Sequence, residues 1–91
     1  MDQILVEGHY YFVDVAIDSC DHSEHIEVFD IHSDKVGSAV VNHDTECVNV
    51  YYNLTEMSAS YPYFDLVHAD GTLAGLLKLA EWIVATDPIN G

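Results

Sequence analysis

Apolar and polar residues alternate along much of the first two thirds of the chain, with the period of two that is typical of strands. In residues 10–17 every odd-numbered position is β-branched or aromatic, whereas the even-numbered set includes Asp14. This pattern predicts a strand that is buried on its odd-numbered side. Residues 25–32 predict a second strand, but their apolar positions change parity between Val28 and Phe29, which indicates a bulge or burial on both faces.

Shorter segments with the same character predict four more strands, separated by turn residues. These segments are residues 4–6, 38–41, 46–52 and 61–68. In the third of them Val48, Val50 and Tyr52 share one face, which we expect to be buried. Residues 53–60 have no strong periodicity and predict a loop.

After residue 70 the pattern changes to the i, i+3, i+4, i+7 spacing of an amphipathic helix. The apolar positions with this spacing are Leu73, Leu76, Leu77, Ala80, Ile83 and Val84. Asp87-Pro88 ends the helix, because proline lacks a backbone donor and disfavours helical backbone in the preceding residue. The other side of the helix carries Leu79 and Trp82. These two predict burial under loops of the same chain, which we favour, or an oligomer contact that would make a homodimer through the helix.

Together these elements predict an α+β fold, with an antiparallel β-sheet of about five to six strands and one C-terminal amphipathic helix packed on one face. At 91 residues and 49% hydrophobic content, the chain is expected to form a single compact acidic domain over residues 1–91. No apolar run approaches the roughly 20 residues of a spanning helix. The N-terminus carries no basic segment of the kind that opens a signal peptide, so a cytoplasmic location is expected.

Charge narrows the possible partners. Sixteen aspartates and glutamates stand against two lysines and no arginine, which gives a formal net charge of −14. Solubility of a small domain needs a net charge of magnitude only about 2 to 8. We do not expect the protein to bind nucleic acid directly, since such binding depends on lysine and arginine residues that neutralise phosphates. The sign of the charge favours a basic partner instead.

The acidic residues are densest between Asp14 and Asp34, a stretch that contains seven of them. Same-face residues of a strand repeat at about 6.6 to 6.8 Å, a separation comparable with that of the phosphates of a nucleic-acid strand. We therefore expect Asp14 and Asp18 to form a row that Glu24 and Asp30 extend across a hairpin. The residues expected to bind a partner are Asp14, Asp18, Asp21, Glu24, Glu27, Asp30, Asp34, Asp44 and Glu46.

Three tyrosines and several metal-ligand residue types accompany the acidic residues. Tyr10, Tyr51 and Tyr61 are candidates for exposed stacking positions, with burial in the core as the alternative. The candidate metal ligands are Cys20, His22, His25, His43 and Cys47. Their spacing matches no recognised zinc finger or knuckle, so a solvated acidic turn with incidental histidines is the preferred interpretation.

No catalytic signature accompanies these residues: the chain has no glycine-rich phosphate loop, no nucleophile elbow and no arginine to hold an anionic substrate. A binding protein without a cofactor is expected rather than an enzyme. In size, acidity and lack of catalytic motifs the chain is similar to small inhibitors of nucleic-acid enzymes, although no stretch carries a family motif. These are the anti-CRISPR and anti-restriction proteins of phages, which mimic DNA, and the immunity proteins or antitoxins that cap a basic nuclease. A third interpretation is an acidic interaction domain adapted to a high-salt cytoplasm.

Overall fold

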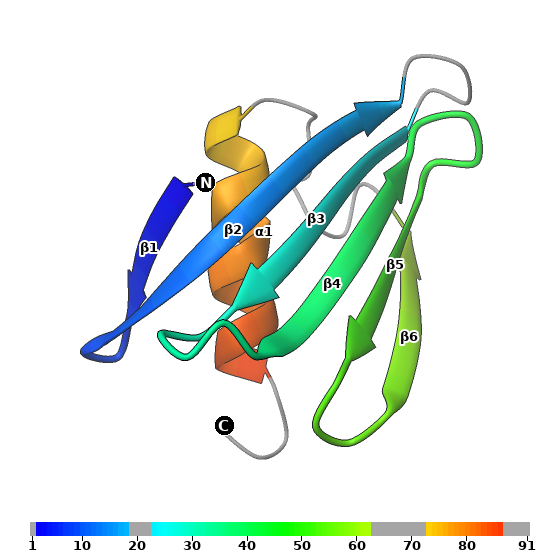
Figure 1. The fold of residues 1–91 in the computed structure, drawn as a ribbon. Coiled ribbons are helices and arrows are strands. Elements are labelled where there is room, and N and C mark those ends of the chain that lie inside the picture. The colour runs from blue at the N-terminus through cyan, green and yellow to red at the C-terminus, as the bar shows by residue number, and fades with distance from the viewer. Residues whose placement is uncertain (1, 19–22, 63–72, 87–91) are drawn as a thin grey trace.

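In a computed structural model of the chain, which describes residues 2–18, 23–62 and 73–86, six strands precede one helix (Figure 1). The elements are β1 (Asp2–Val6), β2 (His9–Asp18), β3 (Ser23–Phe29), β4 (Lys35–Asn42), β5 (Cys47–Tyr52), β6 (Met57–Pro62) and α1 (Leu73–Thr86). The predicted α+β class is confirmed, with the C-terminal helix lying against the sheet.

The six strands form one antiparallel sheet in the order of the sequence, β1 to β6. Each strand pairs with the next one because the turns between them are short, whereas parallel pairing needs a crossover of a dozen or more residues. The tightest described turn is Glu7-Gly8, in which both residues have positive φ (52° and 82°). That backbone is the type I′ turn favoured in two-residue hairpins.

Strand register divides the side chains of the sheet between two faces. Val13 of β2 lies opposite Val28 of β3, and Val41 of β4 lies opposite Val48 of β5. These four valines are fully buried, and they belong to the face that α1 covers (Figure 1). The buried apolar residues are Ile4, Val13, Ile26, Val28, Val36, Ala39, Val41, Val48, Val50, Tyr52, Leu76, Leu79, Ala80, Ile83 and Val84.

Helix α1 packs mainly against β1 to β4, and its side chains also reach the far edge of the sheet. Trp82 meets Tyr61 of β6 edge-on, with ring centroids 5.1 Å apart. At the C-terminal end, the hydroxyl groups of Thr86 and Tyr52 are 2.8 Å apart, and Thr86 also donates to the carbonyl of Trp82. Leu79 is fully buried, in agreement with the interpretation that its own chain covers it.

The observed strand boundaries differ from the predicted ones, most of all at β6. The predicted loop at residues 53–60 is confirmed as a turn for residues 53–56 and wrong for residues 57–60, which belong to β6. This segment, Met57-Ser58-Ala59-Ser60, has weak strand preference by itself, and pairing with β5 overrides that preference. Of the strand predicted at residues 61–68, residues 61 and 62 lie in β6 and the remainder lies outside the described residues.

The parity change at Val28 and Phe29 coincides with a shift in register between β3 and β4, which favours the bulge over burial on both faces, the other predicted alternative. Strand β3 ends at Phe29, three residues earlier than predicted, and Ile31 is exposed in the turn that follows. Within the described ranges, no helix has the length and apolar character needed to cross a membrane.

Candidate functional site

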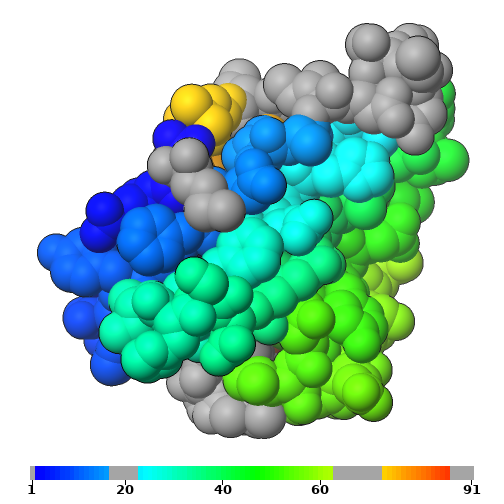
Figure 2. Space-filling view, in the orientation of Figure 1, coloured from blue at the N-terminus to red at the C-terminus, as the bar shows by residue number. Residues whose placement is uncertain are grey.

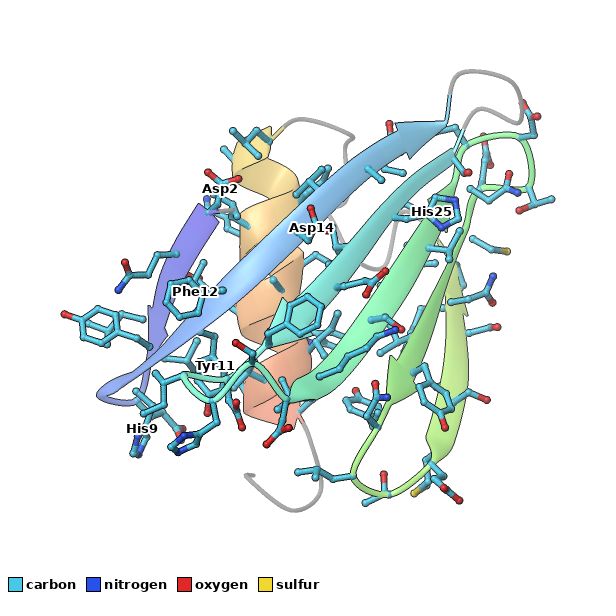
Figure 3. All side chains as sticks on the ribbon, in the orientation of Figure 1. Asp2, His9, Tyr11, Phe12, Asp14 and His25 are labelled. Carbon is cyan, nitrogen blue, oxygen red and sulfur yellow. The ribbon has the colours of Figure 1, made fainter. Side chains whose placement is uncertain are left out.

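The face of the sheet opposite α1, which we call the outer face, is the candidate interaction surface. No described helix or strand covers it, and Figure 2 shows it built from the side chains of successive strands. Asp14 of β2 lies directly opposite Glu27 of β3, and Asp14 points away from the helix, like Phe12 and His25 (Figure 3). The outer face therefore holds two carboxylates on adjacent strands.

Asp14 and Glu27 have little neutralising charge around them. Like charges directly opposite each other destabilise a sheet. The Nζ atom of Lys35 lies 3.5 Å from Glu27 Oε2, and both side chains are more than a third exposed, so this ion pair contributes little to stability. The other lysine of the chain, Lys78, is on helix α1. One carboxylate of the pair thus remains without a neighbouring lysine.

Six further acidic residues of the described part of the chain lie in turns at the two ends of the sheet. One end carries the β1–β2, β3–β4 and β5–β6 turns, with Glu7, Asp30, Asp34 and Glu56. The opposite end carries the β4–β5 turn, with Asp44 and Glu46. Asp21 and the side chain of Asp18 lie outside the described part of the chain.

The expected single row of carboxylates does not form, because two of its members have other surroundings. Glu24 belongs to the helix side of β3, opposite Val41, and its side chain is only 12% exposed. Its Oε2 atom accepts a hydrogen bond from His43 Nε2. Asp30 lies in the β3–β4 turn, where its Oδ1 atom accepts from the backbone N–H groups of His32 (2.8 Å) and Asp34 (3.0 Å). Both residues therefore have structural roles.

Three glutamates occupy backbone positions that disfavour them. Glu7, Glu46 and Glu56 have φ of 52°, 54° and 54°, in the left-handed region where glycine, asparagine and aspartate are the usual residues. For an L-residue this conformation costs roughly 1–2 kcal/mol. Each of the three is exposed in a hairpin turn. Carboxylates are therefore held on the surface at positions where local stability favours another residue.

An apolar corner adjoins the acidic positions of the outer face; we define it as Leu5, Tyr10, Phe12, Phe29 and Ile31. Leu5 pairs with Tyr10, and Phe12 pairs with Phe29, across neighbouring strands. Leu5, Tyr10 and Ile31 are 54%, 51% and 64% exposed. We did not predict this corner, although Tyr10 and Phe12 share the even-numbered side of residues 10–17, which was expected to face away from the core.

A shallow cavity of about 220 Å³ opens beside the apolar corner. It is lined by Gly8, His9, Tyr10, Tyr11, Asp30 and Ile31. It arises because the pairing of β2 with β3 stops at Phe12 and Phe29, where the chain turns towards β4. A volume below the 300–1,000 Å³ of typical small-molecule sites suits one side chain of a partner better than a cofactor.

The other two tyrosines differ from Tyr10 in their surroundings. Tyr51 is 38% exposed on β5, where it pairs with Ser38 of the outer face. Tyr61 is half-buried and packs against Trp82, so it belongs to the core and is not an exposed stacking position.

The candidate metal ligands separate within the described part of the chain. Nε2 of His25 lies 3.1 Å from the Ser23 hydroxyl, His43 contacts Glu24, and the Cys47 thiol donates to the carbonyl of Thr45. Among the described residues, no three His, Cys, Asp or Glu side chains come together as a potential ligand set. Cys20 and His22 lie outside the described residues.

Comparison with protein-family models, with curated proteins and with solved structures finds no match for this chain. Its candidate site is therefore defined by geometry and charge alone: the outer face of the sheet with its opposed carboxylates, the acidic hairpin ends and the apolar corner.

Proposed function

We propose that this protein binds the basic surface of a partner protein, of the kind that holds nucleic acid, and blocks that surface. The observation that carries the proposal is the opposed pair Asp14 and Glu27 on the face of the sheet that no described helix or strand covers. Like charges placed opposite each other weaken a sheet, and Lys35 reaches only the Glu27 member of this pair. A lysine or arginine of a partner would neutralise Asp14, the carboxylate that has no neighbouring lysine in the free chain.

The hairpin glutamates give independent support. Glu7, Glu46 and Glu56 keep carboxylates exposed at the cost of backbone strain. Strained residues of this kind are characteristic of functional positions, where the cost is offset by what the side chain does. Short turns hold these carboxylates at fixed places, as imitation of a phosphate array requires.

The mechanism is steric and electrostatic blockade. Carboxylates of the outer face and of the hairpin ends would pair with the lysines and arginines that otherwise neutralise nucleic-acid phosphates. Complementary charge of this kind accelerates encounter and excludes like-charged partners. Because the Debye length falls from about 10 Å at 0.1 M salt to about 3 Å at 1 M, association should slow steeply as salt rises.

The direct test is capture of a partner followed by competition. Immobilised protein is exposed to a lysate of its source cells, the retained protein is identified by mass spectrometry, and duplex DNA is then added. We expect DNA to release the partner, because both ligands use one basic surface. The identity of the captured protein separates a host nucleic-acid enzyme from a nuclease toxin. Retention that neither DNA nor salt disturbs would contradict the proposal.

A matched pair of variants locates the interaction on the outer face. Asp14→Asn with Glu27→Gln removes two charges from that face, whereas Asp2→Asn with Glu81→Gln removes two from the helix side of the molecule, from β1 and α1. Affinity for the captured partner should fall roughly tenfold for the first pair, because close interfacial charge pairs couple by about 1.5 kcal/mol or more. The second pair should have a smaller effect. Equal losses would indicate that only net charge matters.

A further inference from the structure

The apolar corner is a continuous surface on two rigid supports. Leu5 and Tyr10 are directly paired across β1 and β2, and Tyr10 and Ile31 line the same cavity. The β3–β4 turn that carries Ile31 is held by backbone hydrogen bonds from Ser33 to Asp30 and from Asp30 to Asp34, each 3.0 Å. The backbone on both sides of Ile31, a residue that is 64% exposed, is therefore held by hydrogen bonds within its turn. Single exposed apolar residues are common, but a paired group around a cavity marks an interaction surface.

Acidic groups surround this apolar surface. Glu7 precedes the cavity in the chain, Asp30 forms part of its wall, and Asp34 is exposed in the same turn as Ile31. Asp30 is oriented by the two backbone N–H groups bound to its Oδ1 atom. Among the described residues, its second oxygen, Oδ2, has no hydrogen-bond partner. The cavity thus combines an aromatic wall, an aliphatic wall and an oriented carboxylate.

We infer that the apolar corner docks a segment of a basic partner protein in which an arginine stands beside apolar side chains. The inference rests on the proposed function and adds the chemistry of the anchor. An arginine stem packs on apolar surface, and its planar guanidinium group stacks on aromatic rings and binds carboxylates with paired donors. In the cavity the stem would lie along Ile31, the guanidinium group beside Tyr10 and Asp30. Neighbouring apolar side chains of the segment would cover Leu5 and Phe12.

The negative charge of the chain favours a basic partner segment at the apolar corner over a second copy of the chain. Each copy has a formal net charge of −14. Pairing two copies through this corner would bring Glu7, Asp30 and Asp34 of one copy towards those of the other, with two lysines near by, Lys35 opposite Phe29 and Lys78 beside Leu5 and Glu7. Like charges brought together across an interface cost several kcal/mol. A basic segment gains from the same charges.

The test uses defined peptides as probes, because charge alone attracts any cationic peptide to this chain. One peptide alternates arginine with leucine, and a second of equal length alternates arginine with serine. Each is titrated into ¹⁵N-labelled protein, and amide shifts are followed by NMR. The arginine–leucine peptide should bind about fivefold more tightly or better, the effect of one moderate anchor residue. The amides of Tyr10, Tyr11 and Ile31 should shift most.

Variants assign that preference to the corner. Ile31→Ser and Tyr10→Ser should abolish the advantage of the leucine-containing peptide. The matched controls Leu54→Ser and Tyr51→Ser remove exposed apolar side chains elsewhere, 53% and 38% exposed in the native chain, and should keep it. NMR spectra of each variant confirm that it is folded.

Three results would overturn the inference: equal binding of the two peptides to the native protein, an advantage that survives both corner variants, or a dimer in sedimentation that Ile31→Ser dissociates. None of these bears on capture of a partner that DNA releases. Failure of that capture would count against the proposed function, so the two failures can be distinguished.

Discussion

Glu46 and Glu56 end two hairpin turns of equal length, residues 43–46 and 53–56, and each has φ of 54°. Replacing either glutamate by glycine removes the clash of Cβ with the backbone, a gain of roughly 1–2 kcal/mol. The flexibility of glycine in the unfolded chain offsets about 0.5–1 kcal/mol of it. We therefore expect Glu46→Gly and Glu56→Gly each to raise the free energy of unfolding by about 0.5–1 kcal/mol, measured by urea denaturation.

The glutamine variants separate backbone strain from charge. Glu46→Gln and Glu56→Gln lose the same negative charge as the glycine variants but keep the left-handed side-chain clash, so their stability should stay close to that of the native protein. If glutamine stabilises as much as glycine, charge repulsion rather than strain is the cause. Under the proposed function Glu46→Gly should bind the partner less tightly although it is more stable, the exchange expected at a functional position.

For a single residue, the sequence predicts which face of the sheet the side chain occupies better than it predicts which residues that side chain contacts. The alternation in residues 10–17 correctly places Val13 in the core and Asp14 on the exposed side. The contact of Glu24 with His43 depends on how β3 and β4 are placed in register, which alternation within one strand does not determine. Asp30 likewise became a turn residue because β3 ends at Phe29.

At the scale of the elements, strand β4 and helix α1 lie close together at Gly37, a residue without a side chain. A Cβ atom added to Gly37 of β4 would lie 2.9 Å from Ile83 Cγ2 of α1 and 3.2 Å from the backbone oxygen of Tyr51. Gly37→Ala should therefore separate the helix from the sheet, although alanine normally suits a strand better than glycine does. Overpacking of this kind costs typically about 1–3 kcal/mol. The expected result is a lower urea midpoint with an unchanged denaturant slope.

Gly8→Ala provides the contrast, since nothing lies within 4 Å of a Cβ atom at Gly8 and its φ of +82° is the difficulty. Gly8→Asn should recover part of the stability lost in Gly8→Ala, because asparagine tolerates left-handed backbone. Gly37→Asn should be no better than Gly37→Ala, because a larger side chain meets the same atoms. If asparagine rescues both positions, close packing at Gly37 is not the limiting factor.

The elements with strong periodicity were predictable from the sequence, and the weakly patterned one was not. The apolar spacing of residues 73–84 identifies helix α1 because its buried stripe satisfies the helical period. Strand β6 has serine at two of its six positions and few strongly strand-forming residues. Its conformation comes from pairing with β5, including the hydrogen bond between Ser60 and Asn49, and a tertiary contact of this kind leaves no local pattern. The apolar corner was missed for a related reason, since Ile31 joins it only through the turn.

For the whole molecule, a net charge of −14 on a small domain makes self-repulsion a measurable part of its stability. Repulsion between exposed carboxylates is greatest at low ionic strength, where the Debye length of about 30 Å at 0.01 M is comparable with the longest dimension of the molecule, 33 Å. Raising the salt to about 0.1 M shortens that length to about 10 Å and should increase the free energy of unfolding by on the order of 1 kcal/mol.

The shape of this salt dependence distinguishes a charged binding surface from adaptation to a high-salt cytoplasm. If screening alone is involved, the unfolding free energy should rise most below about 0.3 M sodium chloride and then level off, because shorter Debye lengths leave little repulsion to remove. Sodium sulfate should raise it further, since sulfate also strengthens apolar burial. A protein adapted to high salt would instead be unfolded at low salt and gain stability up to molar concentrations. Urea denaturation across a sodium chloride series measures the difference, and a midpoint that keeps rising steeply beyond about 1 M would favour high-salt adaptation as the origin of the acidic composition.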